Sequence, residues 1–172
     1  MYEAKTGKLL GAQAYGKEGV EKRIDAAAVA LYAQLSVENL TEIDFAYAPP
    51  YSSANDPLNM AAFAAVNALS GYSPQISADE LPLDGSVQIL DVRTYGEYSH
   101  GHLAEAIHIP LDELRDRLDE LSKNTPIRII SEGGFEGHLA NRVLKQQGFN
   151  DVAYISGGWA TLRLRTGLNI EA

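Results

Sequence analysis

The chain has 172 residues, 45% hydrophobic and 22% charged, a balance typical of one large or two small globular domains and not of a disordered protein. Its net charge of −9 comes from both halves, with 8 acidic against 5 basic residues before residue 76 and 15 against 9 from there on, which argues against nucleic acid or an anionic membrane as partner. The absence of cysteine excludes disulfides, zinc–thiolate sites, iron–sulfur clusters and thiol chemistry by this chain.

No apolar run approaches the roughly 18 residues that a membrane-spanning helix needs. The first residues also lack the basic and then apolar pattern of a signal peptide. We therefore expect a cytoplasmic protein.

The first third of the chain is predicted to contain a hairpin and a helix. The pair Thr6-Gly7 is a turn signal, and the strand-like run at residues 8–15 would be one arm of the hairpin. Residues 18–34 carry apolar side chains at helical spacing and predict a helix.

After this helix, Ser36 can cap a short turn at residues 37–40, and residues 43–47 are apolar and extended. The two prolines at 49 and 50 then interrupt regular structure.

A second helix is predicted from Pro57 to about Ser70. Asp56 provides an N-cap acceptor, proline suits the first helical position, and Gly71 can end the helix. Its residues are apolar on nearly every side, so we expect it to be buried against another subunit or domain.

The remainder of the chain alternates strand-like and helix-like segments. Such alternation predicts a mostly parallel sheet covered by helices, an α/β domain. The predicted strands are residues 87–92, 126–130 and 152–155, and the predicted helical segments are residues 97–99, 111–121, 135–147 and 159–165.

Three motifs stand out in the first part: KTGKLLGAQ at residues 5–13, GVEKRID at 19–25 and AYAPPYSSANDPLN at 46–59. They resemble the dimerisation domain of the pyridine nucleotide-disulfide oxidoreductases, especially that of coenzyme A-disulfide reductases and NADH oxidases. The resemblance implies that residues 1–70 form a small α+β dimerisation domain of hairpin strands and helices, followed by a linker at residues 71–76.

The second part contains Asp91-Val92-Arg93, Glu97-Tyr98, Gly101-His102-Leu103, AIHIP at residues 106–110 and Gly157-Gly158-Trp159. Together these motifs resemble a rhodanese domain, which residues 77–172 are expected to form. The order of the two domains is that of the coenzyme A-disulfide and persulfide reductases that carry a C-terminal rhodanese domain.

This resemblance implies a parent enzyme that passes electrons from NADH through FAD to a cysteine. The chain has no G-x-G-x-x-G dinucleotide fingerprint, so we expect no cofactor in the chain itself. We interpret it as a C-terminal piece with Met1 supplied by truncation or expression, the alternative being a natural short protein. The expected partners are a second copy, in a homodimer, and the upstream flavin and NAD domains.

By the same resemblance, Ser131 stands where rhodaneses have their catalytic cysteine. An alcohol forms no persulfide, so the loop of Ser131, Glu132, Gly133, Gly134, Phe135 and Glu136 is interpreted as degenerate. Glu136 stands where this subgroup usually has arginine, and together with Glu132 it would repel anionic sulfur donors. We favour divergence by descent over an engineered Cys→Ser change, which would not explain Glu136.

Two other assignments for polar residues in this part are less favoured. A serine hydrolase with Ser131 as nucleophile and His138 as base would need a G-x-S-x-G elbow, but Ile129 stands two residues before Ser131. His100 and His102 could bind a metal, but no carboxylate lies at convincing ligand spacing, so we interpret them as structural.

Tyr47 and Tyr51 flank the Pro-Pro turn. The resemblance implies that a tyrosine of this motif reaches the partner subunit's active site, where a phenol could donate a hydrogen bond to a thiolate leaving group. The alternative is that both side chains only pack at the interface.

Two functions therefore remain open. Either the chain completes a flavoprotein that reduces a disulfide, a persulfide or oxygen, or its rhodanese-like part is a non-catalytic module that holds a thiol or sulfur carrier.

Overall fold

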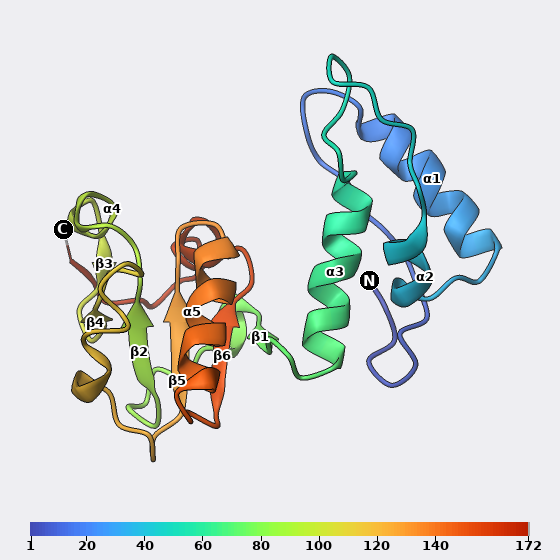
Figure 1. Cartoon of the computed structure of the whole chain (residues 1–172). Helices are drawn as coiled ribbons and strands as arrows, with labels where there is room; N and C mark the ends of the chain where they lie inside the picture. The colour runs from blue at the N-terminus through green and yellow to red at the C-terminus, as the bar shows by residue number, and fades with distance from the viewer. Residues whose placement is uncertain (172) are drawn as a thin grey trace. The chain divides into compact units, whose positions relative to one another are not determined.

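The computed structural model describes residues 1–171 and divides the chain into two compact units, the first ending at Gly71 and the second beginning at Tyr72. The first unit consists of three helices, α1 (Val20–Tyr32), α2 (Val37–Glu42) and α3 (Pro57–Leu69) (Figure 1). A small apolar cluster holds them together, formed by Leu9, Ala30, Leu40 and Ala62.

Two of these helices begin where their capping residues predict. The Ser36 hydroxyl accepts the Asn39 N–H at the start of α2, and an Asp56 carboxylate oxygen accepts the Leu58 N–H at the start of α3. One side of α3 buries Ala62 and Ala65, whereas Met60 and Phe63 are 51% and 37% exposed. Burial of these two side chains against another subunit or domain stays a prediction.

The strand expected at residues 8–15 does not form. Within residues 1–71 the hairpin is reduced to isolated bridges, Tyr2 with Leu9 and Lys8 with Ser36, around a turn at Gly7. A two-stranded hairpin without a third strand has few backbone partners. Leu9 reaches the core, but Leu10 and Tyr15 are exposed. The backbone of Leu10 and Gly11 is hydrogen-bonded to Met1 without extending the bridges into a strand.

The second unit is an α/β domain around a five-stranded sheet in the order β1-β6-β5-β2-β4, with every neighbouring pair parallel. The expected mostly parallel sheet is therefore confirmed. The strands are β1 (Gln75–Ile76), β2 (Gln88–Asp91), β4 (Ile107–His108), β5 (Ile127–Ile130) and β6 (Val152–Ile155).

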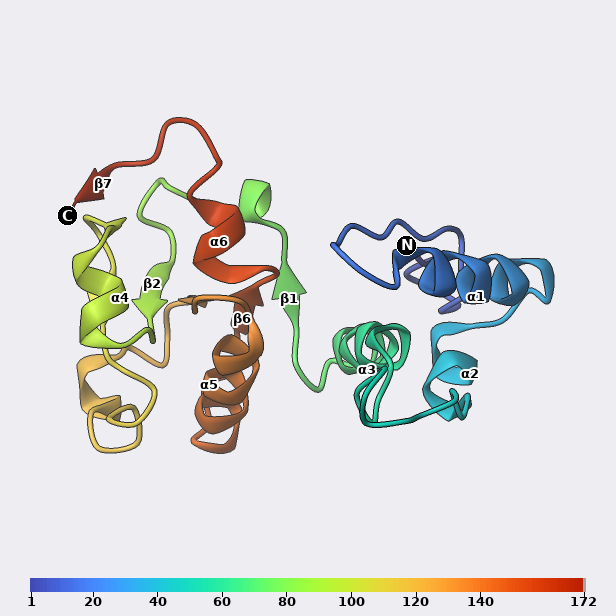
Figure 2. The same ribbon diagram turned by 90° about the horizontal axis from the view of Figure 1, so that it is seen from above.

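Helix α5 (Phe135–Gln146) and helix α6 (Gly158–Leu162) cover opposite faces of this sheet (Figure 2). The side chains of β5 contribute to the core on both faces, because successive strand residues point to opposite sides of a sheet. Ile127 and Ile129 pack in the α5 layer, and Ile130 packs with Trp159 in the α6 layer.

The periphery of the unit is formed by short elements. They are the helix α4 (Tyr95–Ser99), the 3₁₀ turns Ala78–Glu80 and Leu118–Glu120, and an antiparallel pair of strands, β3 (His102–Leu103) and β7 (Ile170–Glu171). Among residues 1–171, no helix is long and apolar enough to cross a bilayer.

Two expectations for this unit were wrong. Residues 71–76 are not only a linker, because β1 pairs in parallel with β6. Residues 111–121 form tight turns and not a helix, with i→i+3 hydrogen bonds such as that from the Leu114 N–H to the Leu111 carbonyl. Leu114 and Leu121 still face the core, so a run of turns satisfies the same apolar spacing.

Candidate functional site

The loop that joins β5 to α5 begins at Ser131, which is 1% exposed. Its Oγ accepts the N–H of Gly134 at 3.0 Å, so the hydroxyl closes the loop on itself. Gly134 has a φ of 110°, a left-handed conformation that glycine adopts without strain, and α5 begins at the next residue. The loop is thus an ordered turn built around a buried hydroxyl.

The start of α6 supports this loop from the other side. The Trp159 N–H donates to the Ser131 carbonyl at 2.7 Å, and the Ala160 N–H donates to the Glu132 carbonyl at 3.2 Å. Gly158 lies so close that a Cβ there would collide with the Ser131 carbonyl oxygen and come within 2.6 Å of the Glu132 carbonyl oxygen. The Gly157-Gly158-Trp159 motif therefore lets α6 hold the loop.

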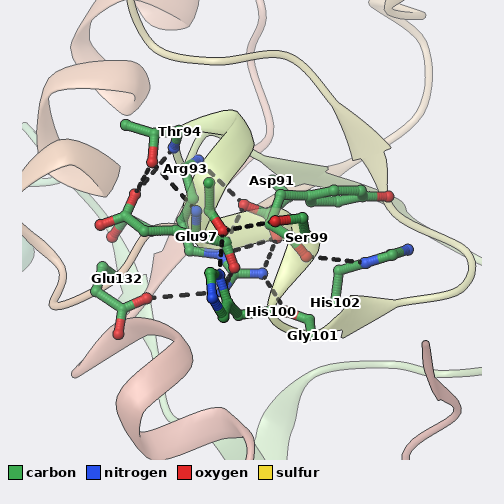
Figure 3. Close-up of polar contacts among 12 residues, drawn as sticks. Asp91, Arg93, Thr94, Glu97, Ser99, His100, Gly101, His102 and Glu132 are labelled. Atoms are coloured by element: carbon green, nitrogen blue, oxygen red, sulfur yellow. Dashed lines mark hydrogen bonds and ion pairs between the residues drawn. The ribbon is translucent and has the colours of Figure 1, made fainter. Parts of the chain in front are cut away.

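Arg93 is buried beside the loop at the end of β2 (Figure 3). Its guanidinium is held by both carboxylate oxygens of Asp91, with 2.7 Å from Nη2 to Oδ2 and 3.0 Å from Nε to Oδ1. Nη2 also donates to the Gly101 carbonyl at 2.8 Å, and the guanidinium lies 4.4 Å from the centre of the Trp159 ring. The protein's own groups therefore hold the Arg93 guanidinium in place.

Glu132 extends from the loop toward this cation. Its Oε2 lies 3.6 Å from the Arg93 Nη1, and Figure 3 shows this contact near His100, the residue that follows α4. At the start of α4 the Thr94 hydroxyl and N–H both donate to Glu97, and these bonds lower the pKa of the Glu97 carboxyl. Both carboxylates are thus held by the frame of the site.

A pocket over the loop is strongly acidic. Arg93 contributes to its lining together with four carboxylates, those of Glu97, Asp112, Glu132 and Glu136. The side chain of Phe135, the residue before Glu136, is exposed. The lining therefore carries more acidic than basic side chains, Glu132 and Glu136 among them.

The other polar residues singled out in the sequence have local partners. His138 Nδ1 lies 2.9 Å from the Ser73 hydroxyl, whereas the Ser131 hydroxyl accepts from Gly134, so neither is bonded to the other. The Nδ1 atoms of His100 and His102 lie 2.5 Å and 3.1 Å from backbone carbonyls. Within residues 1–171, no three histidine or acidic side chains are grouped to hold a metal.

Tyr47 and Tyr51 belong to the first unit, on the loop between α2 and α3. They are 54% and 87% exposed, and the Tyr51 N–H donates to the Ala48 carbonyl at 2.9 Å. The structure thus presents both rings to solvent.

The central position of Arg93 in the site was not predicted from the sequence. The Asp91-x-Arg93 spacing directly after a predicted strand could have indicated it, because a carboxylate and a guanidinium two residues apart at a strand end can form a bidentate pair.

Residues 76–163, just over half of the chain, match the rhodanese-like domain family. The chain belongs to that family. In addition to this rhodanese-like domain, residues 1–57 match the dimerisation domain of the pyridine nucleotide-disulphide oxidoreductases.

Curated relatives match each part separately. The putative sulfur carrier protein YrkF of Bacillus subtilis is 37% identical over 90 residues, covering 52% of this chain and 46% of that protein. A coenzyme A disulfide reductase of Staphylococcus aureus is 48% identical over 64 residues, 37% of this chain and 15% of that enzyme. The chain therefore spans less than half the length of these relatives.

Two solved structures resemble the chain over both parts. The reduced Bacillus anthracis CoADR-RHD matches with a TM-score of 0.89 and 38% identity, covering 94% of this chain and 29% of the other. A NAD-dependent persulfide reductase from A. fulgidus matches with a TM-score of 0.74 and 38% identity, covering 85% of this chain and 26% of the other. The expected likeness to the C-terminal region of such reductases, carrying a rhodanese-like domain, is confirmed.

Proposed function

We propose that this chain serves as the C-terminal region of an FAD- and NADH-dependent flavoprotein that reduces a disulfide, a persulfide or oxygen. In this proposal the region of residues 1–70 forms the homodimer interface and the rhodanese-like region of residues 77–172 transfers no sulfur. The upstream flavin and NAD domains would supply both cofactors and the redox cysteine. A cytoplasmic location stays part of the proposal.

The observation that carries the proposal is the Ser131 hydroxyl at the base of the loop. It lies where a rhodanese would hold a persulfide, yet an alcohol gives no anion near neutral pH and forms no persulfide. The acidic lining of the pocket, from Glu132 and Glu136 among others, adds repulsion toward an anionic donor.

The purified chain tests the proposal directly. We expect no thiocyanate from thiosulfate and cyanide, no flavin absorbance band and no oxidation of NADH. Thiocyanate formation by the unmodified chain would contradict the proposal that the rhodanese-like domain transfers no sulfur. A flavin band near equimolar occupancy would contradict the assignment of the cofactors to upstream domains.

For Tyr47 and Tyr51 we propose contact with the partner subunit's redox site, with at least one phenol donating to a leaving thiolate. Their exposure in the single chain supports this role, because each ring is available for a surface that the chain itself does not provide.

A second candidate is a binding module that holds a thiol or sulfur carrier without reacting with it. The likeness to YrkF, named a putative sulfur carrier protein, and the exposed side chain of Phe135 on the Ser131 loop favour it. Calorimetric titration with coenzyme A and glutathione, comparing the unmodified chain with Phe135→Ala, distinguishes this candidate from a purely structural domain.

A further inference from the structure

The loop at residues 44–55 is held at its base by one side chain. Asn59, in the first turn of α3, is buried, and its Nδ2 donates to the carbonyls of Leu40 at 2.9 Å and Ile43 at 3.0 Å, where the loop begins. Its Oδ1 accepts the N–H of Asp56 at 3.2 Å, where the loop ends. A single amide thus joins the two ends of the loop.

The closing end has a second attachment. The buried carboxylate of Asp56 caps α3 through the Leu58 N–H at 3.0 Å and lies 3.2 Å from Nη2 of Arg23 on α1. Arg23 also donates to the Gly19 carbonyl at 3.0 Å. The base of the loop is therefore fixed to all three helices of the first unit.

The tip of the same loop contrasts with its base. Tyr47 and Tyr51 are exposed, and the consecutive prolines at 49 and 50 restrict the backbone between them. A rigid base, a stiff turn and exposed aromatic rings are the features of a contact surface arranged before its partner binds.

We propose that Asn59 is the positioning residue of this loop, fixing how Tyr47 and Tyr51 are presented to the partner subunit. The proposal rests on the proposed function for the identity of that partner. The proposal depends on three hydrogen bonds of one buried amide, two donated and one accepted, which close the loop. This closure can be tested in the chain by itself.

The test is the rate of chymotrypsin cleavage after individual tyrosines in the full chain. Cleavage needs local opening, so its rate follows the population of the opened loop. In Asn59→Ala we expect cleavage after Tyr47 and Tyr51 to accelerate by about fivefold or more, the effect of losing one net hydrogen bond of ordinary strength. Cleavage after Tyr32, at the end of α1, should change by less than about twofold.

Asn59→Asp is a second variant that keeps the size of the side chain. Its carboxylate can still accept from Asp56 but meets the carbonyl oxygens of Leu40 and Ile43 without a proton to donate, so the loop should open as in Asn59→Ala. The matched control is Asn67→Ala on the same helix, whose side chain has no hydrogen bond within residues 1–171 and which should behave as the unmodified chain.

Unchanged cleavage after Tyr47 and Tyr51 in both Asn59 variants would overturn the proposal. An equal acceleration after Tyr32, or loss of the helical circular dichroism in both variants, would also overturn it, because Asn59 would then only stabilise the whole unit. Sedimentation of the unmodified chain is independent of these results. A monomer would count against the proposed dimer and leave the loop-closing role of Asn59 standing.

Discussion

The buried Ser131 hydroxyl determines what a repaired loop can do. Ser131→Cys would place a thiol among the loop N–H groups, but Glu132 and Glu136 would raise the pKa of that thiol and repel an anionic donor. We expect Ser131→Cys alone to recover little sulfurtransferase activity. With Glu136→Arg added, thiocyanate formation should exceed the sum of the two single variants at equal protein concentration.

Two results would change this interpretation. If Ser131→Cys alone equals the double variant, the electrostatic argument is wrong and an engineered Cys→Ser change becomes the better explanation. If a folded double variant is inactive, the binding-module function is favoured. The ion pair between Arg93 and Glu132 bears on the outcome, because it offsets part of the negative charge of Glu132, whereas no ion pair is formed by Glu136 within residues 1–171.

His138 gives the second unit a stability that depends on pH. Burial, with a smaller effect of the Arg142 charge, lowers the pKa of His138 below its ordinary value of about 6.5. The unfolded chain therefore takes up the proton first as pH falls. The stabilisation from neutral His138 is complete above about pH 6.5 and is lost as the pH falls toward the lower pKa of the folded state.

The measurement is the urea concentration at the midpoint of unfolding of the second unit, at pH 7.5 and at lower pH. His138→Gln should lose less stability on acidification than the unmodified chain. His100→Gln, at an exposed histidine, is the matched control and should lose as much as the unmodified chain. Equal losses in all three proteins would show that His138 does not contribute.

At the scale of elements, α1 and α5 end with the same hydrogen-bond pattern but different residues. In α1 the Leu35 N–H reaches the Ala30 carbonyl past Gln34, and in α5 the Phe149 N–H reaches the Leu144 carbonyl past Gly148. This is the Schellman ending, whose turning residue has a left-handed conformation. Gln34 has a φ of 56°, where glycine carries no steric penalty.

We expect Gln34→Gly to stabilise the first unit by about 1 kcal/mol, since the side chain of Gln34 is exposed and its loss removes no packing. Gly148→Ala should destabilise the second unit by a similar amount. Thermal or urea denaturation, followed for each unit, checks both. A destabilised Gln34→Gly would mean that the extra freedom of glycine in the unfolded chain outweighs the relief of strain.

The elements that sequence patterns identified well are those with strong local signals. The start of α3 follows from Asp56-Pro57, and β6 follows from a short apolar run before a glycine turn. The turns at residues 111–121 were mistaken for a helix because apolar spacing alone does not distinguish i→i+3 from i→i+4 hydrogen bonds. The two residues of β1 were missed because β6, the strand with which they pair, lies far along the chain.

In the candidate site, too, some features could be predicted from the sequence and others only from the fold. Ser131 and the loop glycines could be located from the sequence, because a family motif marks their positions. The ion pair of Arg93 with Glu132 joins residues from two different strand ends, and only the fold shows that these ends meet. The closing of the tyrosine loop by Asn59 is likewise a matter of distances within the first unit.

For the whole molecule, we predict self-association through the first unit. Met60 and Phe63 lie one helical turn apart on α3, and both are partly exposed. A domain of this size has few other apolar surfaces that could bury them. Met60→Lys with Phe63→Glu should convert the dimer to a monomer in analytical ultracentrifugation. Leu139→Lys, an apolar residue of the second unit with exposure similar to that of Phe63, should leave the dimer intact. A monomeric unmodified chain would contradict this prediction.

The pairing of β1 with β6 determines where the two units can be separated. Pro74 and Ile76 accept hydrogen bonds from Tyr154 and Ser156, and Ser73 lies against His138 on α5. A cut at residue 76 would strip an edge strand from the sheet and leave the backbone of β6 open to pairing with other chains, a route to aggregation. A cut after Gly71 leaves the sheet complete. Gene fusion or domain exchange that preserves both units would therefore join sequences at Gly71 and not at the end of the apparent linker.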